Sequence, residues 1–246
     1  IMDIKKQYFE LAKKGIENAY EVNKEDMKKI ASCLRDVMEN EGVVQLFGVK
    51  HGEEVVNELF FRAGGLVPFH GLKPMELAVQ GKFGRELIDS GEIFETTKYV
   101  DDLLSLFKMD DRDAWLITSF YGNEPMAVEL AKRAKEKGQK VIGLVNKASY
   151  AKSPVKHESG KKLLDYCDYS LDMCAEEPDV ALHVDGHAVG QLSSVYANVI
   201  AQMLAADIYH AFEEIGVEAP VLLSANIAGA DKHNNALTDR YNGRVR

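Results

Sequence analysis

Short apolar runs and segments of helical period alternate along the chain. In residues 43–65, VVQLFGVKHGEEVVNELFFRAGG, an apolar run ends at Gly48, and a helical repeat of apolar residues begins near Gly52 and stops at a Gly-Gly pair. A short run with β-branched residues indicates a buried strand, and the change of period indicates a helix. This stretch therefore predicts a strand, a tight loop and a helix.

Further apolar runs predict the rest of a sheet. An amphipathic helix from Pro125 to about Lys137 separates two of these runs, so they form a strand-helix-strand unit. The crossover in such a unit is right-handed and its two strands are parallel. We therefore predict a single three-layer α/β domain with a mainly parallel sheet. The strand candidates after the first are 66–69, 114–118, 141–145 and an edge strand at 169–173.

The segments outside these strands are predicted to be mostly helical. Residues 3–41 predict a pair of helices, because Asn23 suits the N-terminal cap of a second helix. The Asp185-Gly186 pair predicts a hairpin turn inside 180–189. The other expected helices are 94–107, 192–215 and one that begins near Asp231. Because no repeat or linker interrupts the chain, we expect one domain made of the parts 1–41, 42–216 and 217–246.

The net charge argues against several classes of partner. The formal net charge is −9 at pH 7, whereas nucleic acids and anionic membranes attract basic surfaces. We therefore expect no nucleic-acid partner and no membrane partner, and no apolar segment reaches the roughly 18 residues of a membrane span. The three cysteines form an odd set without metal-type spacing, which fits a reducing cytoplasm better than a disulfide framework.

The loop after the first strand is the first candidate site, because free N–H groups at such a junction attract an anion. His51, Glu54 and Glu58 follow at i, i+3 and i+7, so they share one helix face. Spacing alone favours a solvated face over a site. His157 in a polar loop is on its own an ordinary surface histidine, and Gln202 on the long apolar helix is an expected interhelical hydrogen-bond partner.

Four segments from residue 43 onward carry a resemblance to a known family: LFGVKH with ELFFRAGGL, AWLITSFYGNEPMAVELAKRAKEKGQKVIGLV, SPVKHESGKKLLDYCD and LSANIAGADKHN. In these segments the chain resembles the sugar isomerase (SIS) domain family, and within it a bacterial branch of phosphoheptose isomerase-like and phosphosugar-binding proteins. The last two segments are specific to that branch. The resemblance implies a five-stranded parallel sheet flanked by helices, with a phosphosugar at the carboxyl ends of the strands.

The resemblance also implies roles for single residues. Glu58 aligns with the catalytic glutamate of phosphoheptose isomerases, so we predict that it is the base, with His51 and His157 as candidates for the proton shuttle because imidazole titrates near neutral pH. Glu54 aligns with a metal-ligand histidine of some relatives. A carboxylate pair without nearby imidazoles is a weak zinc site, so we expect no metal and no cofactor. The expected ligand-binding residues are Gly48, Lys50, Gly52, Thr118, Ser119, Gly122, Asn123, Ser159, Lys161 and His233.

Both phosphate loops depart from the pattern of the family. Relatives have loops rich in serine and glycine, whereas this chain has Val-Lys-His-Gly at 49–52 and Thr-Ser-Phe-Tyr-Gly-Asn at 118–123. Several hydroxyl groups are therefore missing, and Lys50 can supply a point charge in their place. We expect the loops 48–53, 118–124 and 146–161 to converge on one cleft at the carboxyl ends of the strands.

The expected function is the isomerisation of a small-molecule sugar phosphate between its aldose and ketose forms. Two alternatives remain open at this point: a non-catalytic phosphosugar-binding or regulatory module, and a lyase that acts on an amino-sugar phosphate ether, a reaction that the family also performs. The N-terminal helices and the 192–215 helix carry more apolar surface than one sheet can cover. We therefore expect a homodimer or a homotetramer.

Overall fold

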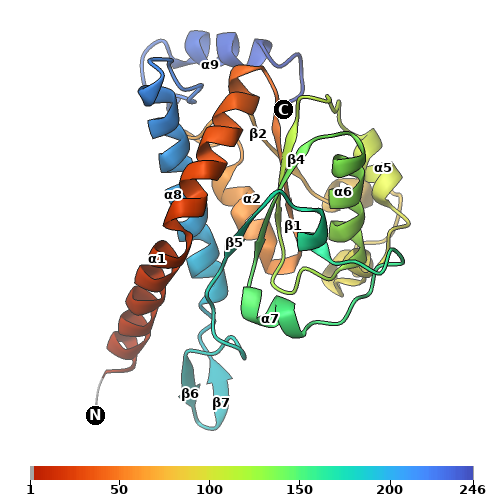
Figure 1. The fold of residues 1–246 in the computed structure, drawn as a ribbon, viewed down its shortest axis with the longest axis vertical. Coiled ribbons are helices and arrows are strands. Elements are labelled where there is room, and N and C mark those ends of the chain that lie inside the picture. Colours follow the sequence, from red (N-terminus) through yellow and green to blue (C-terminus); the bar gives the residue numbers. More distant parts are fainter. Residues whose placement is uncertain (1–2, 246) are drawn as a thin grey trace.

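The computed structural model describes residues 3–245 and contains a five-stranded sheet with helices on both faces (Figure 1). The strand order is β2-β1-β3-β4-β5, and every neighbouring pair of strands is parallel. The predicted α/β fold with a mainly parallel five-stranded sheet is thus confirmed. The five strands are β1 (Val44–Gly48), β2 (Phe69–Leu72), β3 (Ala114–Thr118), β4 (Lys140–Val145) and β5 (Tyr169–Asp172).

Two layers of helices cover the sheet. Alternate residues of each strand face opposite layers, so Leu116 of β3 packs in one apolar cluster while Trp115 and Ile117 pack in the other. The first layer consists of α1 (Ile4–Glu39), α2 (Glu53–Leu59) and α8 (Ser193–Glu214), and the second is mainly α5 (Val100–Ser105) and α6 (Pro125–Glu136). In Figure 1 the first layer lies to the left of the sheet and the second to its right.

The remaining elements are short and lie around this core. The segment between β2 and β3 contains α3 (Met75–Val79), α4 (Glu86–Asp89) and the 3-10 turn η2 (Glu92–Glu95) before α5. A 3-10 turn, η1 (Lys50–Gly52), follows β1. The others are α7 (Lys147–Lys152), η3 (Leu163–Tyr166), the antiparallel hairpin β6 (Leu182–Val184) and β7 (His187–Val189), and α9 (Ala230–Asp239). No helix within residues 3–245 combines the length and the apolar character that a membrane span needs.

The predicted N-terminal helical pair is wrong, because residues 4–39 form one helix of 36 residues. Asn23 does not cap a second helix. Its amide nitrogen donates to the carbonyl oxygens of Ala19 and Asp172 at 2.8 Å, and its oxygen accepts from the Asp172 N–H at 2.8 Å. The side chain thus pairs with the edge strand β5, and the helix continues past it because its local preference for a cap is satisfied by a distant segment.

Three other predicted boundaries differ from the structure. The second strand covers 69–72 instead of 66–69, since the Val67 N–H bonds to the Pro220 carbonyl at 2.8 Å in an antiparallel contact with the C-terminal tail. Helix α2 ends at Leu59, because Phe60 is extended and Phe61 has φ of 45°. The predicted helix 94–107 is split into η2 and α5 by an extended Thr96.

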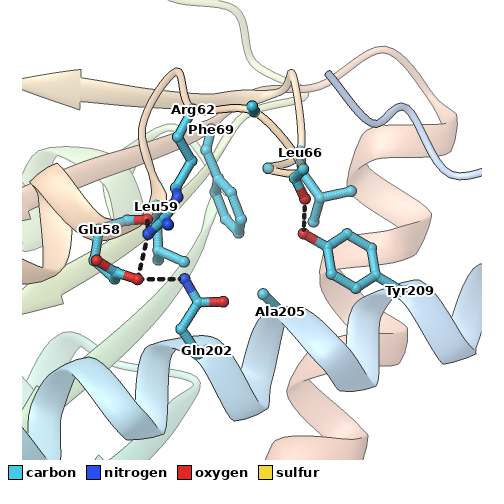
Figure 2. A pocket seen from close by; sticks show the side chains of 11 residues that line it. Glu58, Leu59, Arg62, Leu66, Phe69, Gln202, Ala205 and Tyr209 are labelled. Atoms are coloured by element: carbon cyan, nitrogen blue, oxygen red, sulfur yellow. Dashed lines mark hydrogen bonds and ion pairs between the residues drawn. The ribbon is translucent and has the colours of Figure 1, made fainter. Parts of the chain in front are cut away.

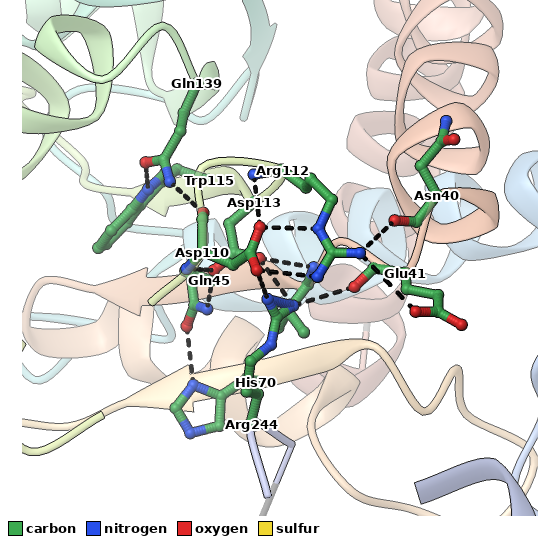
Figure 3. Close-up of polar contacts among 11 residues, drawn as sticks. Asn40, Glu41, Gln45, His70, Asp110, Arg112, Asp113, Trp115, Gln139 and Arg244 are labelled. Atoms are coloured by element: carbon green, nitrogen blue, oxygen red, sulfur yellow. Dashed lines mark hydrogen bonds and ion pairs between the residues drawn. The ribbon is translucent and has the colours of Figure 1, made fainter. Parts of the chain in front are cut away.

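A buried polar network ties the C-terminal residues to the amino ends of β1 and β3 (Figure 3). The Asp113 carboxylate accepts from the Val43 N–H at 2.9 Å and from Gln45 Nε2 at 3.0 Å. It also accepts from an Arg244 guanidinium nitrogen at 3.0 Å. The Asp113 side chain is 0% exposed and the Arg244 side chain is 8% exposed. Gln45 in turn contacts His70 at 2.8 Å, and burial lowers the pKa of His70 to about 4, so this imidazole is neutral at pH 7.

We predict that Arg244→Met destabilises the protein strongly, because it leaves Asp113 buried without its counter-charge. Removal of one partner of a buried ion pair costs about 3 to 5 kcal/mol, which corresponds to a fall in Tm of roughly 10 °C for a chain of this size. Scanning calorimetry measures the change. The matched control is Arg112→Met, which removes a half-exposed arginine from Asp110 nearby and is expected to cost less than about 1 kcal/mol. Equal losses for the two variants would contradict a special role of the buried pair.

Candidate functional site

The order in which the chain adds strands to the sheet reverses between β1 and β3. The chain runs from β1 outward to β2 and then returns to β3 on the other side of β1. Open parallel sheets bind ligands outside the carboxyl ends of the strands at such a switch point. A cleft of about 440 Å³ lies there, and its lining comes from the loops after β1 and β3, the segment before α8 and the start of α8: Val49, Lys50, His51, Gly52, Phe120, Tyr121, Glu124, Met173, Glu177, Pro178, Asp179, Val180, Gln191, Ser193, Ser194 and Ala197.

Two glycines let the loop after β1 pack directly on the end of β3. A Cβ atom at Gly48 would lie 2.2 Å from the Gly52 carbonyl oxygen, and a Cβ atom at Gly52 would lie 2.6 Å from the Thr118 carbonyl oxygen. Only glycine fits at such distances. Between them Lys50 has φ of 52°, a left-handed conformation that costs a non-glycine residue free energy and is concentrated at functional sites.

The loop after β3 is closed by hydrogen bonds of its own. Ser119 is fully buried; its hydroxyl donates to Glu124 Oε2 at 2.5 Å and accepts from the Gly122 N–H at 2.7 Å. Asn123 is also buried and donates to the Pro154 carbonyl at 2.9 Å. Thr118 Oγ1 is buried, and within the described part of the chain it has no hydrogen-bond partner. None of the predicted ligand residues in this loop lines the cleft. Glu124, from the same loop, does line it.

His157 lies under α6 and does not line the cleft. The Ser159 N–H donates to His157 Nδ1 at 3.1 Å, so Nε2 carries the proton and donates to Glu129 at 3.0 Å. Burial raises the pKa of Glu129, but hydrogen bonds from Arg133 and Lys132 outweigh it, and the net shift is downward. This arrangement anchors the polar loop to α6.

The predicted convergence of three loops holds for two of them. None of the residues 146–161 lines the cleft. The segment 149–156 instead lines part of a neighbouring cavity of about 310 Å³, which shares Tyr121 and Glu177 with the cleft. Lys161 places its ammonium over the Tyr166 ring, 5.0 Å from the centroid. Residues 177–180 line the cleft where the loop 146–161 was expected to line it.

Glu58 lies on α2 beside a separate, smaller cavity of about 180 Å³ (Figure 2). Its carboxylate pairs with Arg62 and accepts from Gln202 Nε2 at 2.6 Å, and its side chain is 33% exposed. Gln202 thus makes the expected interhelical hydrogen bond, from α8 to α2, and its partner is the predicted base. The spacing along α8 does not reveal this partner, because the contact joins residues 144 positions apart.

His233 lies in the C-terminal tail, at the amino end of the sheet. Its Nε2 contacts the Val221 carbonyl oxygen at 3.0 Å, and Asn234 bonds both the N–H and the carbonyl of Leu223. The tail then pairs with the wall of the smaller cavity, where the Gly64 N–H donates to the Leu222 carbonyl at 2.7 Å. Among residues 3–245, no group of three or more His, Cys, Asp or Glu side chains is placed to hold a metal ion.

Sequence reasoning missed the three carboxylates of the cleft. Glu177 accepts from the Ser149 hydroxyl at 2.8 Å, and Asp179 accepts from the N–H of Leu192 at 2.9 Å ahead of α8. Their segment has no motif that marks it, since it reaches the cleft only through the packing of α8. The position of Glu124 directly after Asn123, in the second predicted loop, is the sequence feature that indicates its place near the cleft.

Comparisons with known proteins agree with this architecture. Residues 7–146, more than half of the chain, match the SIS domain family. The UPF0309 protein GK1441 of Geobacillus kaustophilus is 30% identical over 97% of this chain and 94% of its own length. The UPF0309 protein TTE0306 of Caldanaerobacter subterraneus is 32% identical over 97% of this chain and 98% of its own.

Solved structures with low identity share the fold. A phosphoheptose isomerase from Francisella tularensis has a TM-score of 0.52 at 16% identity, over 85% of this chain and 98% of its own. The Vibrio vulnificus NanR protein complexed with ManNAc-6P has a TM-score of 0.50 at 13% identity, over 96% of this chain and 68% of its own. A structure from Silicibacter pomeroyi, with a TM-score of 0.51 at 16% identity, covers 98% of this chain, which spans only 56% of that protein. From the sequence match and the relatives, the chain belongs to the SIS domain family.

Proposed function

We propose that the chain binds a phosphorylated sugar in the cleft between the loops after β1 and β3. One observation carries this proposal: an SIS-family chain has its 440 Å³ cleft at the switch point of the parallel sheet. The named ligands and activities of proteins with the same fold point in the same direction, since one is a phosphoheptose isomerase and another is a complex with ManNAc-6P.

The lining of the cleft suits such a ligand. Among the described residues that line it, Lys50 is the only Lys or Arg, and an ammonium group is a common point-charge partner of phosphate. Gln191, Ser193 and Ser194 line the opposite wall and offer amide and hydroxyl groups to sugar hydroxyls. The apolar ring faces of Phe120 and Tyr121 complete a pocket in which a few polar groups orient a ligand.

A second candidate function is the isomerisation of this sugar phosphate, with Glu58 as the base. The observation that favours it is the Glu58 carboxylate, which Gln202 and Arg62 hold in one orientation while it stays one-third exposed. The reaction moves a proton between adjacent carbons through an enediol, so it needs a carboxylate at the carbon acid and a group that shuttles protons between two oxygens. His51 lines the cleft and serves as the shuttle, whereas His157 is engaged with Glu129.

Glu58 follows Gly52 by six residues, about 9 Å along the axis of α2. Glu58 lines the smaller cavity, which shares no lining residue with the cleft, so the proposal requires the sugar to extend beyond the cleft along this helix, from its phosphate at Lys50 to Glu58.

We also propose that the protein assembles as a homodimer or a dimer of dimers. The N-terminal part of α1 projects beyond the sheet next to the β6–β7 hairpin (Figure 1) and exposes apolar side chains, with Phe9 61%, Val22 51% and Tyr20 49% exposed. Phe9 and Tyr20 are eleven residues apart on this helix and therefore share one face, which favours this part of α1 as an interaction site. Sedimentation at micromolar concentration is expected to give the mass of a dimer or tetramer, and Phe9→Asp to shift it toward the monomer; a monomeric wild-type chain would contradict the proposal.

The binding proposal predicts thermal stabilisation by a sugar phosphate. Fructose 6-phosphate at about 100 times its Kd adds about 2.7 kcal/mol to the free energy of unfolding, which raises Tm by about 5 to 10 °C. Fructose and inorganic phosphate alone are expected to give smaller shifts. Lys50→Ala removes most of the shift, while Lys161→Ala, whose side chain lies outside the cleft, retains it. The absence of a shift with a panel of sugar phosphates, or equal losses in the two variants, contradicts the placement of the ligand.

The isomerase proposal predicts separate effects on turnover and on binding. Glu58→Gln keeps the size and the hydrogen-bonding capacity of the side chain but removes the base, so turnover should fall by at least about 100-fold. Calorimetric binding of the sugar phosphate should be retained. Glu54→Gln, an exposed change on the same helix, is the control and should leave turnover within a few-fold of the wild type. An isomerase activity that survives in Glu58→Gln shows that another group is the base.

A further inference from the structure

We propose that Asn198 of α8 recognises a hydroxyl group of the bound sugar, midway between the phosphate at Lys50 and the carboxylate of Glu58. The inference rests on the proposed function and adds to it a residue that determines specificity. Asn198 lines neither the cleft nor the smaller cavity. Two observations carry the inference: the position of Asn198 between these two sites, and the unbonded state of its side-chain amide.

Helices α2 and α8 both lead from the cleft to the smaller cavity. Gly52, directly before α2, and Ser194, in the first turn of α8, line the cleft. Further along the two helices, Glu58 and Gln202 line the smaller cavity and are hydrogen-bonded to each other at 2.6 Å (Figure 2). A sugar phosphate that reaches from the cleft to Glu58 therefore lies along both helices.

Asn198 is at the middle of this path. It lies one turn of α8 beyond Ser194 and one turn before Gln202. Residues four apart share one face of a helix, so these three side chains form a polar row from the cleft to the smaller cavity. At 1.5 Å per residue, Asn198 is about 6 Å along the helix axis from each of the other two. Its amide is thus placed for the middle of a ligand that spans both sites.

The amide of Asn198 has no partner in the protein. Its Oδ1 atom is buried and accepts no hydrogen bond within residues 3–245. Its nitrogen donates to no acceptor in this part of the chain either but, unlike the oxygen, it is not buried. An asparagine amide offers two N–H donors and a carbonyl acceptor, and a buried polar atom without a partner costs free energy.

The other buried or half-buried asparagines of residues 3–245 are all hydrogen-bonded. Asn23 and Asn234 each bond both the N–H and the carbonyl of one backbone residue. Asn123 donates to the Pro154 carbonyl, and the side-chain oxygen of Asn146 accepts from the Ala175 N–H. An unbonded amide is therefore an exception in this protein, and it lies where the proposed ligand passes.

The geometry indicates which part of the sugar Asn198 contacts. In a hexose 6-phosphate the phosphate is assigned to Lys50, and the carbons between which the proton moves, C1 and C2, lie at Glu58. The hydroxyl groups on C3 and C4 then lie between these ends, opposite the middle of the polar row. The Asn198 nitrogen donates to the oxygen of one of these hydroxyl groups.

Deoxy sugars test the assignment on the wild-type chain. Titration calorimetry compares glucose 6-phosphate with its 3-deoxy and 4-deoxy derivatives, which keep the phosphate and lose one hydroxyl group each. One of the two derivatives is expected to bind about threefold to tenfold more weakly than glucose 6-phosphate, the effect of one hydrogen bond. Equal affinities for the three compounds overturn the assignment.

Two variants and a matched control locate the contact. Asn198→Ala should bind glucose 6-phosphate as weakly as the wild type binds the affected deoxy sugar, and should no longer distinguish the two compounds. Val199→Ala, a truncation of the next residue along α8, should keep the difference. A difference that persists in Asn198→Ala assigns the hydroxyl group to another residue and overturns the inference.

Thermal unfolding separates recognition of the ligand from a structural role. Asn198→Leu keeps the size of the side chain and removes the buried unbonded oxygen, so the free protein should unfold at the same Tm as the wild type or at a higher one. Its affinity for glucose 6-phosphate should fall as in Asn198→Ala. A lower Tm with unchanged affinity would show that Asn198 only supports the packing of α8. If none of the three sugar phosphates binds the wild type, the proposed function fails together with this inference.

Discussion

The hydrogen bond from the Val49 N–H to the Thr118 carbonyl, at 2.9 Å, joins the loop after β1 to the end of β3. The cleft depends on this contact, because it brings together the first residues after two parallel strands at the switch point of the sheet. The contact in turn depends on Gly48 and Gly52, where a Cβ atom would collide with the backbone of the loop or of β3. Lys50 adopts its strained conformation within the same tight turn and lines the cleft.

The opposite wall of the cleft comes from a part of the chain that is remote in sequence. Asp179 accepts the N–H groups of Leu192 and Ser193, which anchors the segment before α8 to the start of that helix. The wall thereby gains the hydroxyl groups of Ser193 and Ser194, while α8 continues along α2 as far as the Glu58–Gln202 contact. One helix thus contributes both to the binding cleft and to the orientation of the proposed base, and a rigid scaffold of this kind holds a site more precisely than loops alone.

The fold was predictable from the sequence because its signals are local. Runs such as 114–118 are buried on both faces and read as strands without knowledge of their neighbours, and Asp185-Gly186 marks its hairpin turn by backbone preference alone. The predicted helix break at Asn23 failed for the opposite reason: the side chain that would cap a helix bonds β5 instead, and only the tertiary structure brings β5 to it.

The site was predictable only in part. The first loop follows β1 directly, so Lys50, His51 and Gly52 reach the cleft as the topology requires. His157 and His233 were placed by resemblance of motifs, and the structure engages them in anchoring contacts with Glu129 and with the Val221 carbonyl. Glu124 lines the cleft and accepts from the Ser119 hydroxyl, a contact that no spacing in the sequence encodes.

A crystal structure of the protein with fructose 6-phosphate tests the central claim most directly, because it locates the sugar phosphate relative to the two loops. The account predicts density in the cleft between the loops after β1 and β3, with the phosphate within hydrogen-bond distance of the Lys50 ammonium. Density for the phosphate against Ser119, or a ligand confined to the cavity beside Glu58 and absent from the cleft, would contradict it.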